Sequence, residues 1–183
     1  VGFTYDDSSF GSAPGVDPPR LLPRDRKLAY PWVAAEWLQD EFQTALNRDQ
    51  VERTEDFSLG WRGRASLGLA SSSLGSDRNA AILSGGVAKG LSLSNRQTLL
   101  LDANVSSRLE GGSIANGLLG GEARYYFRQS PRRLFFLGFA ATAGSNLDID
   151  QQVLLGGDTG VRGYPLRYQA GKGSWSFTAE QRL

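Results

Sequence analysis

The chain has 183 residues, with 23 Gly and 7 Pro but no Cys, His or Met, and its formal net charge is +1. The absence of Cys and His excludes disulfides, zinc fingers, haem and iron–sulfur ligation, and catalysis by a Ser–His or Cys–His pair. The balanced charge gives no reason to expect nucleic acid as a partner. No stretch approaches the roughly 18 consecutive apolar residues of a membrane-spanning helix.

Alternation of apolar and polar residues predicts antiparallel strands along most of the chain. Two less regular strands are expected first, within residues 1–10 and 28–46, where the neighbouring Trp32 and Val33 indicate a bulge or a change of face. Six regular strands follow, at 57–69, 81–93, 99–110, 119–128, 135–144 and 173–183. Their odd positions are mostly apolar or small, and their even positions are mostly polar or glycine. The pattern predicts about eight strands in one domain spanning residues 1–183, and no helix.

The connections fit an up-and-down sheet. Short polar turns are expected at 94–97 and 129–132. Longer loops rich in Gly, Ser or Pro are expected at 11–27, 71–79, 110–113 and 146–173. The length of the turn near residues 47–50 is left open. Long and short connections that alternate in this way predict strands that run up and down in chain order.

An antiparallel sheet with one apolar face fits either a soluble sandwich or a membrane barrel. Three features favour the barrel. The predicted strands are about 9 to 13 residues long, close to what crosses a bilayer when tilted. Aromatic residues such as Trp61 and Trp175 lie near strand ends, as in interfacial girdles. Charged residues occupy mid-strand positions of the polar face, which predicts a lumen lined by Arg62, Arg64, Asp102, Arg108, Glu122 and Arg124.

One stretch carries a resemblance to a known family. The last long loop contains Gly156-Gly157 followed by Val161-Arg162-Gly163-Tyr164, and the strand after it ends with Glu180-Gln181-Arg182. With these residues the chain resembles the bacterial surface antigen superfamily, the barrels of outer-membrane protein assembly factors and two-partner secretion transporters. That family carries a Gly-Gly pair before a Val-Arg-Gly-Tyr or Val-Arg-Gly-Phe tetrad in its sixth extracellular loop, and a Glu-x-Arg element in the next strand. Residues 53–60 also look like a strand of the family.

The resemblance implies a fold and a role for the loop. It implies an antiparallel transmembrane β-barrel of about sixteen strands in the bacterial outer membrane, of which this chain supplies about eight. The loop is expected to fold into the lumen, where Arg162 reaches Glu180, Gly163 permits a turn or a close approach, and Tyr164 packs against the wall. The family's soluble periplasmic modules and the strand that follows residue 183 are not in the chain, so we expect a middle-to-late section of the barrel.

The expected function is non-enzymatic: insertion or translocation of other proteins at the outer membrane, without metal or cofactor. The expected partners are outer-membrane lipids, unfolded outer-membrane or secreted proteins, and accessory lipoproteins or periplasmic modules. Two alternatives stay open: a small closed barrel acting as a pore or anchor, and the barrel anchor of a membrane-bound enzyme. In the second, Asp102 and Glu122 would take part in acid–base chemistry. The loop acids Asp148, Asp150 and Asp158 are interpreted as solvated rather than as calcium ligands.

Overall fold

The computed structural model describes residues 1–12, 14, 15, 17, 21–46, 53–161 and 163–183. The strands are β1 (Gly2–Ser8), β2 (Arg26–Leu38), β3 (Phe42–Leu46), β4 (Thr54–Ser58), β5 (Arg62–Ala70), β6 (Ala80–Ser94), β7 (Gln97–Glu110), β8 (Ser113–Ser130), β9 (Arg133–Ser145), β10 (Val153–Leu155), β11 (Gln169–Gly171) and β12 (Gly173–Arg182). Within the described ranges the one helical element is a 3-10 turn at Ser72–Leu74, and no helix there could cross a membrane. The predicted all-β class is confirmed.

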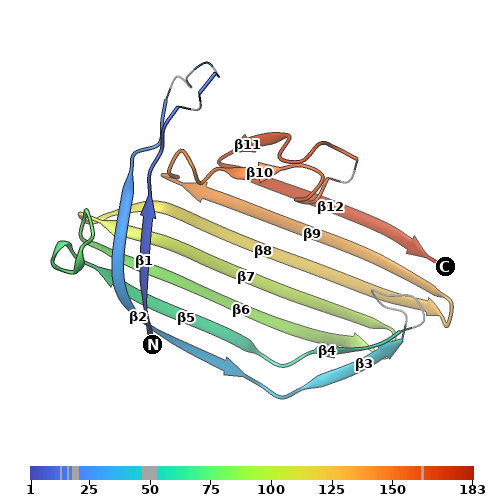
Figure 1. Cartoon of the computed structure of the whole chain (residues 1–183). Coiled ribbons are helices and arrows are strands. Elements are labelled where there is room, and N and C mark those ends of the chain that lie inside the picture. Colours follow the sequence, from blue (N-terminus) through green and yellow to red (C-terminus); the bar gives the residue numbers. More distant parts are fainter. Residues whose placement is uncertain (13, 16, 18–20, 47–52, 162) are drawn as a thin grey trace.

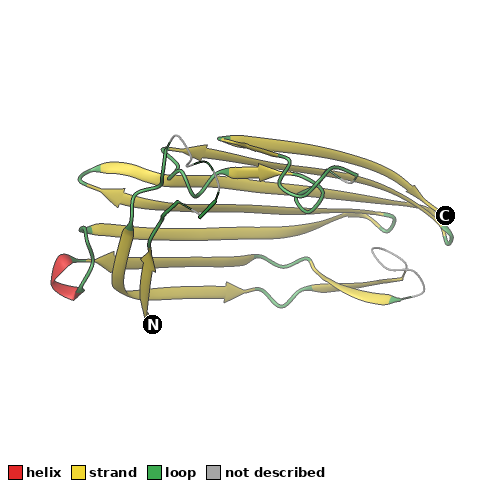
Figure 2. Cartoon of the chain, turned by 45° about the horizontal axis from the view of Figure 1, so that its top comes forward, coloured by secondary structure: helices red, strands yellow, loops and turns green. Residues whose placement is uncertain are grey.

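Eight strands form one antiparallel sheet in the order β1-β2-β5-β6-β7-β8-β9-β12 (Figure 1). The short strands pair separately, β3 with β4 and β10 with β11. β1 and β12 are the two edges of the large sheet, and no pairing joins them among the described residues. The sheet is therefore open. Figure 2 shows it as a single curved layer, with β1 and the first part of β2 turned away from the other strands.

The register keeps alternate side chains of all eight strands on common faces. One row runs from Val87 through Ala103, Gly121 and Ala141 to Trp175. We call the face formed by these odd-numbered residues the outer face, and the opposite face, formed by the even-numbered residues, the inner face. The parity holds up to three register shifts near strand ends, at Ser92–Ser94, Ser106–Arg108 and Arg128–Ser130. Because side chains alternate along a strand, the sequence pattern carries over directly to the two faces.

β2 pairs with two neighbours in turn. Residues 26–32 pair with β1, and residues 32–38 pair with β5. Ala29 lies in the part of β2 that does not pair with β5. There the hydroxyl of Ser76 takes the place of a strand: it accepts a hydrogen bond from the N–H of Ala29 at 2.8 Å and donates one to the carbonyl of Ala29 at 2.9 Å. The irregular pattern predicted within 28–46 therefore reflects a change of partner at Trp32, followed by an interruption before β3.

The predicted strand at 57–69 is wrong, because it is two strands separated by Leu59–Trp61. At this break the N–H of Gln39 donates to the carbonyl of Trp61 at 2.8 Å. Gly60 lies so close to the carbonyl oxygen of Gln39 that a side chain would not fit there. The break lets β4 leave the plane of the large sheet together with β3.

Of the other connections, one is shorter than the sequence suggested, and the long loop at 146–173 contains the paired strands β10 and β11. The connection at 110–113 is a two-residue turn, not a long loop: Gly111 and Gly112 have φ values of 55° and 82°, as the type I′ hairpin turn requires. The short turns at 94–97 and 129–132 are confirmed. The turn near residues 47–50 lies outside the described residues. We call the end of the sheet with the turns at 94–97 and 129–132 the turn end, and the opposite end, which carries residues 146–172, the loop end.

Buried side chains are few, and most of them lie on the inner face; Ala29 of β2, at an odd-numbered position, is an exception. One cluster joins Leu28, Ala70 and Ala80 at the loop end, and another joins Tyr126, Leu134 and Phe136 at the turn end. The accessible surface of the chain is 12274 Å². A compact globular protein of 19.8 kDa exposes about 8,600 Å². The open sheet thus leaves an unusually large area uncovered.

Candidate functional site

The outer face of the sheet is apolar and exposed. Trp175, Phe177 and Leu119 have exposed fractions of 71%, 60% and 59%. On the described strands of the large sheet, the charged residues of this face are Asp7 and Lys27 at the loop end, Arg133 at the turn end, and Lys89. The ammonium group of Lys89 lies 3.4 Å from a carboxylate oxygen of Glu41, so this charge has a partner. The middle of the outer face is otherwise uncharged.

The inner face is polar, and along β12 its side chains are less exposed than those of the outer face. In β12, Ser174, Ser176 and Thr178 are half-buried, whereas Trp175 and Phe177 between them are exposed. A soluble antiparallel sheet buries its apolar face and exposes its polar one. In this sheet the apolar outer face is exposed, and along β12 the polar face is the less exposed of the two.

The six charged residues predicted to line a lumen all lie on the inner face, but they do not form one group. Arg62, Arg64 and Asp102 surround a hollow of about 200 Å³ near the middle of the sheet, together with Glu36 of β2. Glu36 is directly opposite Arg64 in the register of β2 and β5. The sixth predicted residue, Arg108, lies at the loop end instead.

Small residues on β6 make room for this hollow. The inner positions of β6 include Ser84, Gly86 and Ala88, which separate the arginines of β5 from Asp102 of β7. The side chain of Arg64 reaches over Gly86, where a Cβ atom would stand 3.1 Å from its Nε atom. A larger residue at Gly86 would therefore displace the guanidinium group from the hollow.

A second hollow of about 290 Å³ lies toward the turn end and contains the remaining charges. Asp102 and Glu122 face each other across β7 and β8. Opposed like charges are destabilising, but Arg62 and Arg124 line the same hollow, and Arg124 Nε lies 3.5 Å from Glu122 Oε1. Ser58 of β4 also lines it, and its buried hydroxyl has no hydrogen-bond partner among the described residues. Charges of both signs here could bind a polar or charged chain.

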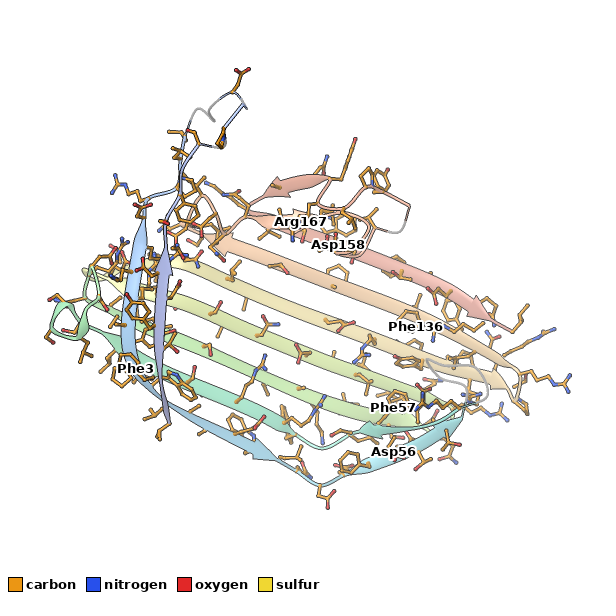
Figure 3. All side chains as sticks on the ribbon, viewed as in Figure 1. Phe3, Asp56, Phe57, Phe136, Asp158 and Arg167 are labelled. Carbon is orange, nitrogen blue, oxygen red and sulfur yellow. The ribbon has the colours of Figure 1, made fainter. Side chains whose placement is uncertain are left out.

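The β3–β4 hairpin covers the inner face at the turn end, which the sequence did not predict. The ring of Phe57 packs 6.2 Å from that of Tyr126, which in turn packs 5.1 Å from Phe136. Figure 3 shows Phe57 and Phe136 at this end of the sheet. The N–H of Gly90 donates to the carbonyl of Leu59 at 3.1 Å. Only a residue without a side chain allows the backbone of β4 to approach β6 so closely.

At the loop end, charged residues connect strands that are far apart. Arg108 Nη1 and Arg26 Nη1 both donate to Asp148 Oδ2 at 3.0 Å, and Arg26 Nη2 donates to Asp150 Oδ2 at 3.0 Å. The interpretation of Asp148 and Asp150 as solvated acids is therefore wrong. The alternation of side chains places Arg26 and Arg108 on the inner face. Their shared partner Asp148 is 122 residues from Arg26 and 40 residues from Arg108, so no local sequence signal identifies it.

The pKa values of two loop acids record these contacts. Burial raises the pKa of Asp150, but hydrogen bonds from Arg26 and Gln151 outweigh it, so the pKa lies below its usual 3.8. The hydrogen bond from Arg78 likewise lowers the pKa of Asp77, in the loop between β5 and β6. Both groups are anionic at neutral pH and can serve as permanent partners of the arginines.

The loop that carries the family resemblance is compact and glycine-dependent. The N–H of Gly157 donates to the carbonyl of Pro165 at 3.1 Å, and the N–H of Val161 donates to the carbonyl of Gly156 at 3.1 Å. A Cβ atom on Gly156 would lie 2.5 Å from the backbone nitrogen of Arg167. Gly163 has a φ of 88°, so it adopts the left-handed turn conformation that the resemblance implied. Figure 3 shows Asp158 and Arg167 in this loop above β12.

The loop approaches the inner face at Gly160, whereas its second half is exposed. A Cβ atom on Gly160 would stand 3.4 Å from the hydroxyl of Ser176 in β12. Tyr164, however, is 54% exposed, and its ring packs 5.4 Å from that of Tyr168 in the same loop. The expected packing of Tyr164 against the wall is therefore wrong. The two tyrosines, with Leu155 and Val161, line a hollow of about 390 Å³.

The expected contact between Arg162 and Glu180 stays a prediction, because Arg162 lies outside the described residues. Glu180 is on the inner face and half-buried. Its carboxylate accepts a hydrogen bond from Arg182 Nε at 3.0 Å, and the Arg182 guanidinium lies 4.5 Å from the centre of the Phe136 ring. Glu180 therefore already belongs to the contacts at the turn end.

No group of three or more metal-ligating side chains occurs in the part of the chain that the structure describes. Comparison of the chain with family models, with curated proteins and with solved structures finds no match. The resemblance to the surface antigen superfamily therefore depends on the sequence motif alone. The structure adds three features: an open sheet, an apolar outer face and a charged inner face. The β3–β4 hairpin covers the inner face at the turn end, and the loop after β9 covers it at the loop end.

Proposed function

We propose that the chain forms part of the wall of an outer-membrane β-barrel that inserts or translocates other proteins. The observation that carries the proposal is the polarity of the sheet: large apolar side chains are exposed on the outer face, and charges of both signs line hollows of the inner face. Lipid would cover the first, and a water-filled lumen would contain the second.

The height of the apolar surface supports a lipid-facing role. In β7 the outer positions from Leu99 to Leu109 are apolar except Ser107. Ten residue steps of about 3.4 Å, tilted by about 40°, give an apolar band roughly 26 Å tall. The outward-facing band of outer-membrane barrels is about 25 Å tall. The outer face therefore matches the hydrocarbon layer without further adjustment.

The edges of the sheet suggest how other chains would be handled. β12 pairs with β9 along Gly173–Arg182, and its other side has no partner strand among the described residues. Such an edge offers backbone donors and acceptors to an incoming strand. We propose that further strands complete the barrel at β1 and β12, and that polypeptide substrates enter through strand addition at a seam of the completed barrel.

A second candidate, a passive pore or anchor, is favoured by the charged hollows of the inner face, which would suit a hydrated channel. Reconstitution into lipid vesicles separates the two. We expect the vesicles to accelerate folding of an added, urea-denatured outer-membrane protein relative to protein-free vesicles, or to take up an unfolded secreted protein. Ion conductance without either activity would support the pore. Failure to insert into vesicles would contradict both.

A further inference from the structure

The chain that leaves β9 turns back across the loop end of the sheet. Asn146 has a φ of 48°, its side chain donates to the carbonyl of Ile114 at 2.9 Å, and its carbonyl accepts from the N–H of Asn116 at 2.8 Å. Leu147 then packs over Gly144, where a Cβ atom would stand 2.5 Å from the leucine side chain. These contacts direct residues 147–151 over β8 and toward β7 and β2, instead of straight on into solvent.

Two arginines hold this segment at its far side. Arg108 binds Asp148 with both terminal nitrogens, Nη1 to Oδ2 at 3.0 Å and Nη2 to Oδ1 at 3.2 Å, which is the strong two-point arrangement. Arg26, from β2, divides its nitrogens between Asp148 and Asp150. In the sheet order, β5 and β6 separate β2 from β7. One short loop segment therefore ties together three separate parts of the sheet.

The charged groups of these contacts are largely buried. The side chains of Arg26 and Arg108 are 10% and 7% exposed, and those of Asp148 and Asp150 are 26% and 15% exposed. Both arginines contact the same oxygen of Asp148, so the two cations are close to each other. Two buried cations this close repel each other, and the carboxylate of Asp148 that they share offsets this repulsion, with Asp150 beside Arg26 and Glu110 beside Arg108. The two buried arginines therefore stabilise Asp148 and Asp150 in the positions where they contact them.

The segment forms a roof over a part of the inner face. Beneath it lies a hollow of about 240 Å³, lined by both arginines, by Ser106 and by Gln151 from the segment itself. Ser106 is a half-buried inner residue of β7. With residues 147–151 released, this hollow would open directly at the loop end.

We infer that Arg26 and Arg108 latch residues 147–151 over the inner face, closing it at the loop end, and that release of Asp148 and Asp150 opens it. The inference builds on the proposed function, because in a completed barrel this roof would close the outer mouth of the lumen. The device needs no change in the strands. Its moving part is the segment between the turn at Asn146 and β10.

The latch is tested through the reactivity of a single cysteine placed beneath the roof. Since the chain has no Cys, Ser106→Cys supplies the one thiol, and its labelling by a charged methanethiosulfonate reagent is followed in detergent micelles. We expect Asp148→Asn, which removes the one acid that both arginines share but leaves Arg26 with Asp150 and Arg108 with Glu110, to raise the labelling rate at least about tenfold. Asp150→Asn leaves both arginines in contact with Asp148 and is expected to give a smaller rise.

Two controls make the comparison specific. Asp158→Asn, in the same loop, removes only a carboxylate that accepts from the Arg167 backbone at 3.5 Å, and it should leave the rate at Ser106→Cys unchanged. The reporter Ala88→Cys, which lines the hollow near the middle of the sheet, should react equally fast in every background. If Asp148→Asn does not fold, the test rests on the labelling rate of Ser106→Cys in the Asp150→Asn background, compared with the rate in the parent background.

Equal labelling of Ser106→Cys with and without the acids would overturn the latch. This result would not touch the proposed function, because the measurement is made in micelles. Failure of the protein to enter vesicles would overturn the proposed function and leave the latch to be judged by its own rates.

Discussion

An arginine substituted into the outer face should destabilise the protein far more than an arginine substituted into the inner face. Ala103 is an exposed outer residue of β7, one residue from the middle of the apolar run between Leu99 and Leu109. That offset corresponds to about 3 Å along the strand. Arginine at position 103 would therefore place its charge close to the middle of the hydrocarbon layer.

The expected cost follows from this depth. An arginine at the bilayer midplane of a barrel costs about 2–4 kcal/mol, which lowers the folding equilibrium constant roughly 30- to 700-fold. Ala140→Arg is the matched control, because Ala140 is a half-buried inner residue directly opposite Glu122. With a carboxylate beside it and water above it, this arginine is expected to change the free energy of unfolding by less than about 1 kcal/mol.

The assay is urea unfolding of the protein in lipid vesicles, followed by tryptophan fluorescence. The difference in the free energy of unfolding between each variant and the parent gives the destabilisation that each arginine causes. If Ala140→Arg were as destabilising as Ala103→Arg, or more so, the assignment of the outer face to lipid would be refuted. A soluble sheet whose odd-numbered face met water would give that result.

Three further outcomes follow from particular contacts. Gly90→Ala should weaken the near-ultraviolet circular dichroism of the aromatic cluster at the turn end, because its methyl group would meet the Leu59 backbone at 2.7 Å, whereas Gly85→Ala should not. Tyr126→Ala should lower the free energy of unfolding by about 3–5 kcal/mol in urea titrations, because this side chain is 1% exposed. The folded-state pKa of Asp150 lies below its usual 3.8, so its stabilising contribution is complete above that value and is lost as pH falls through the lowered pKa. Unfolding curves measured from pH 6 to pH 2 should show this loss in the parent and not in Asp150→Asn.

The strands and their two faces could be predicted because one local signal determines both. In β7 the alternation from Leu99 to Leu109 identifies the strand and also the side on which Asp102 and Arg108 lie. The open edges of the sheet and the reversed exposure of Trp175 follow from the same pattern once the pairing order is known. The short polar turns at 94–97 and 129–132 predicted two of the hairpins, whereas the turn at 110–113 was expected to be a longer loop.

What the sequence did not reveal depends on contacts between distant segments. The alternation continues through Leu59–Trp61, so nothing local shows that the chain leaves the sheet there to let β4 cover the inner face. The partners of Arg26 lie more than 120 residues away, and acids in a loop ordinarily read as solvated. Tyr164 is exposed because it packs on Tyr168, four residues along the same loop, rather than on the sheet.

Quenching of single tryptophans by lipids brominated on their acyl chains tests directly whether the outer face contacts lipid. Two variants retain either Trp175 or Trp32, with the other tryptophans replaced by Phe. Trp175 is an outer residue, 71% exposed, whereas Trp32 lies on the inner face with its Nε1 donating to Thr4 Oγ1 at 3.1 Å. Strong quenching of Trp175 together with weak quenching of Trp32 is the predicted result. Equal quenching of the two, or quenching of Trp32 alone, would contradict a lipid-facing outer surface.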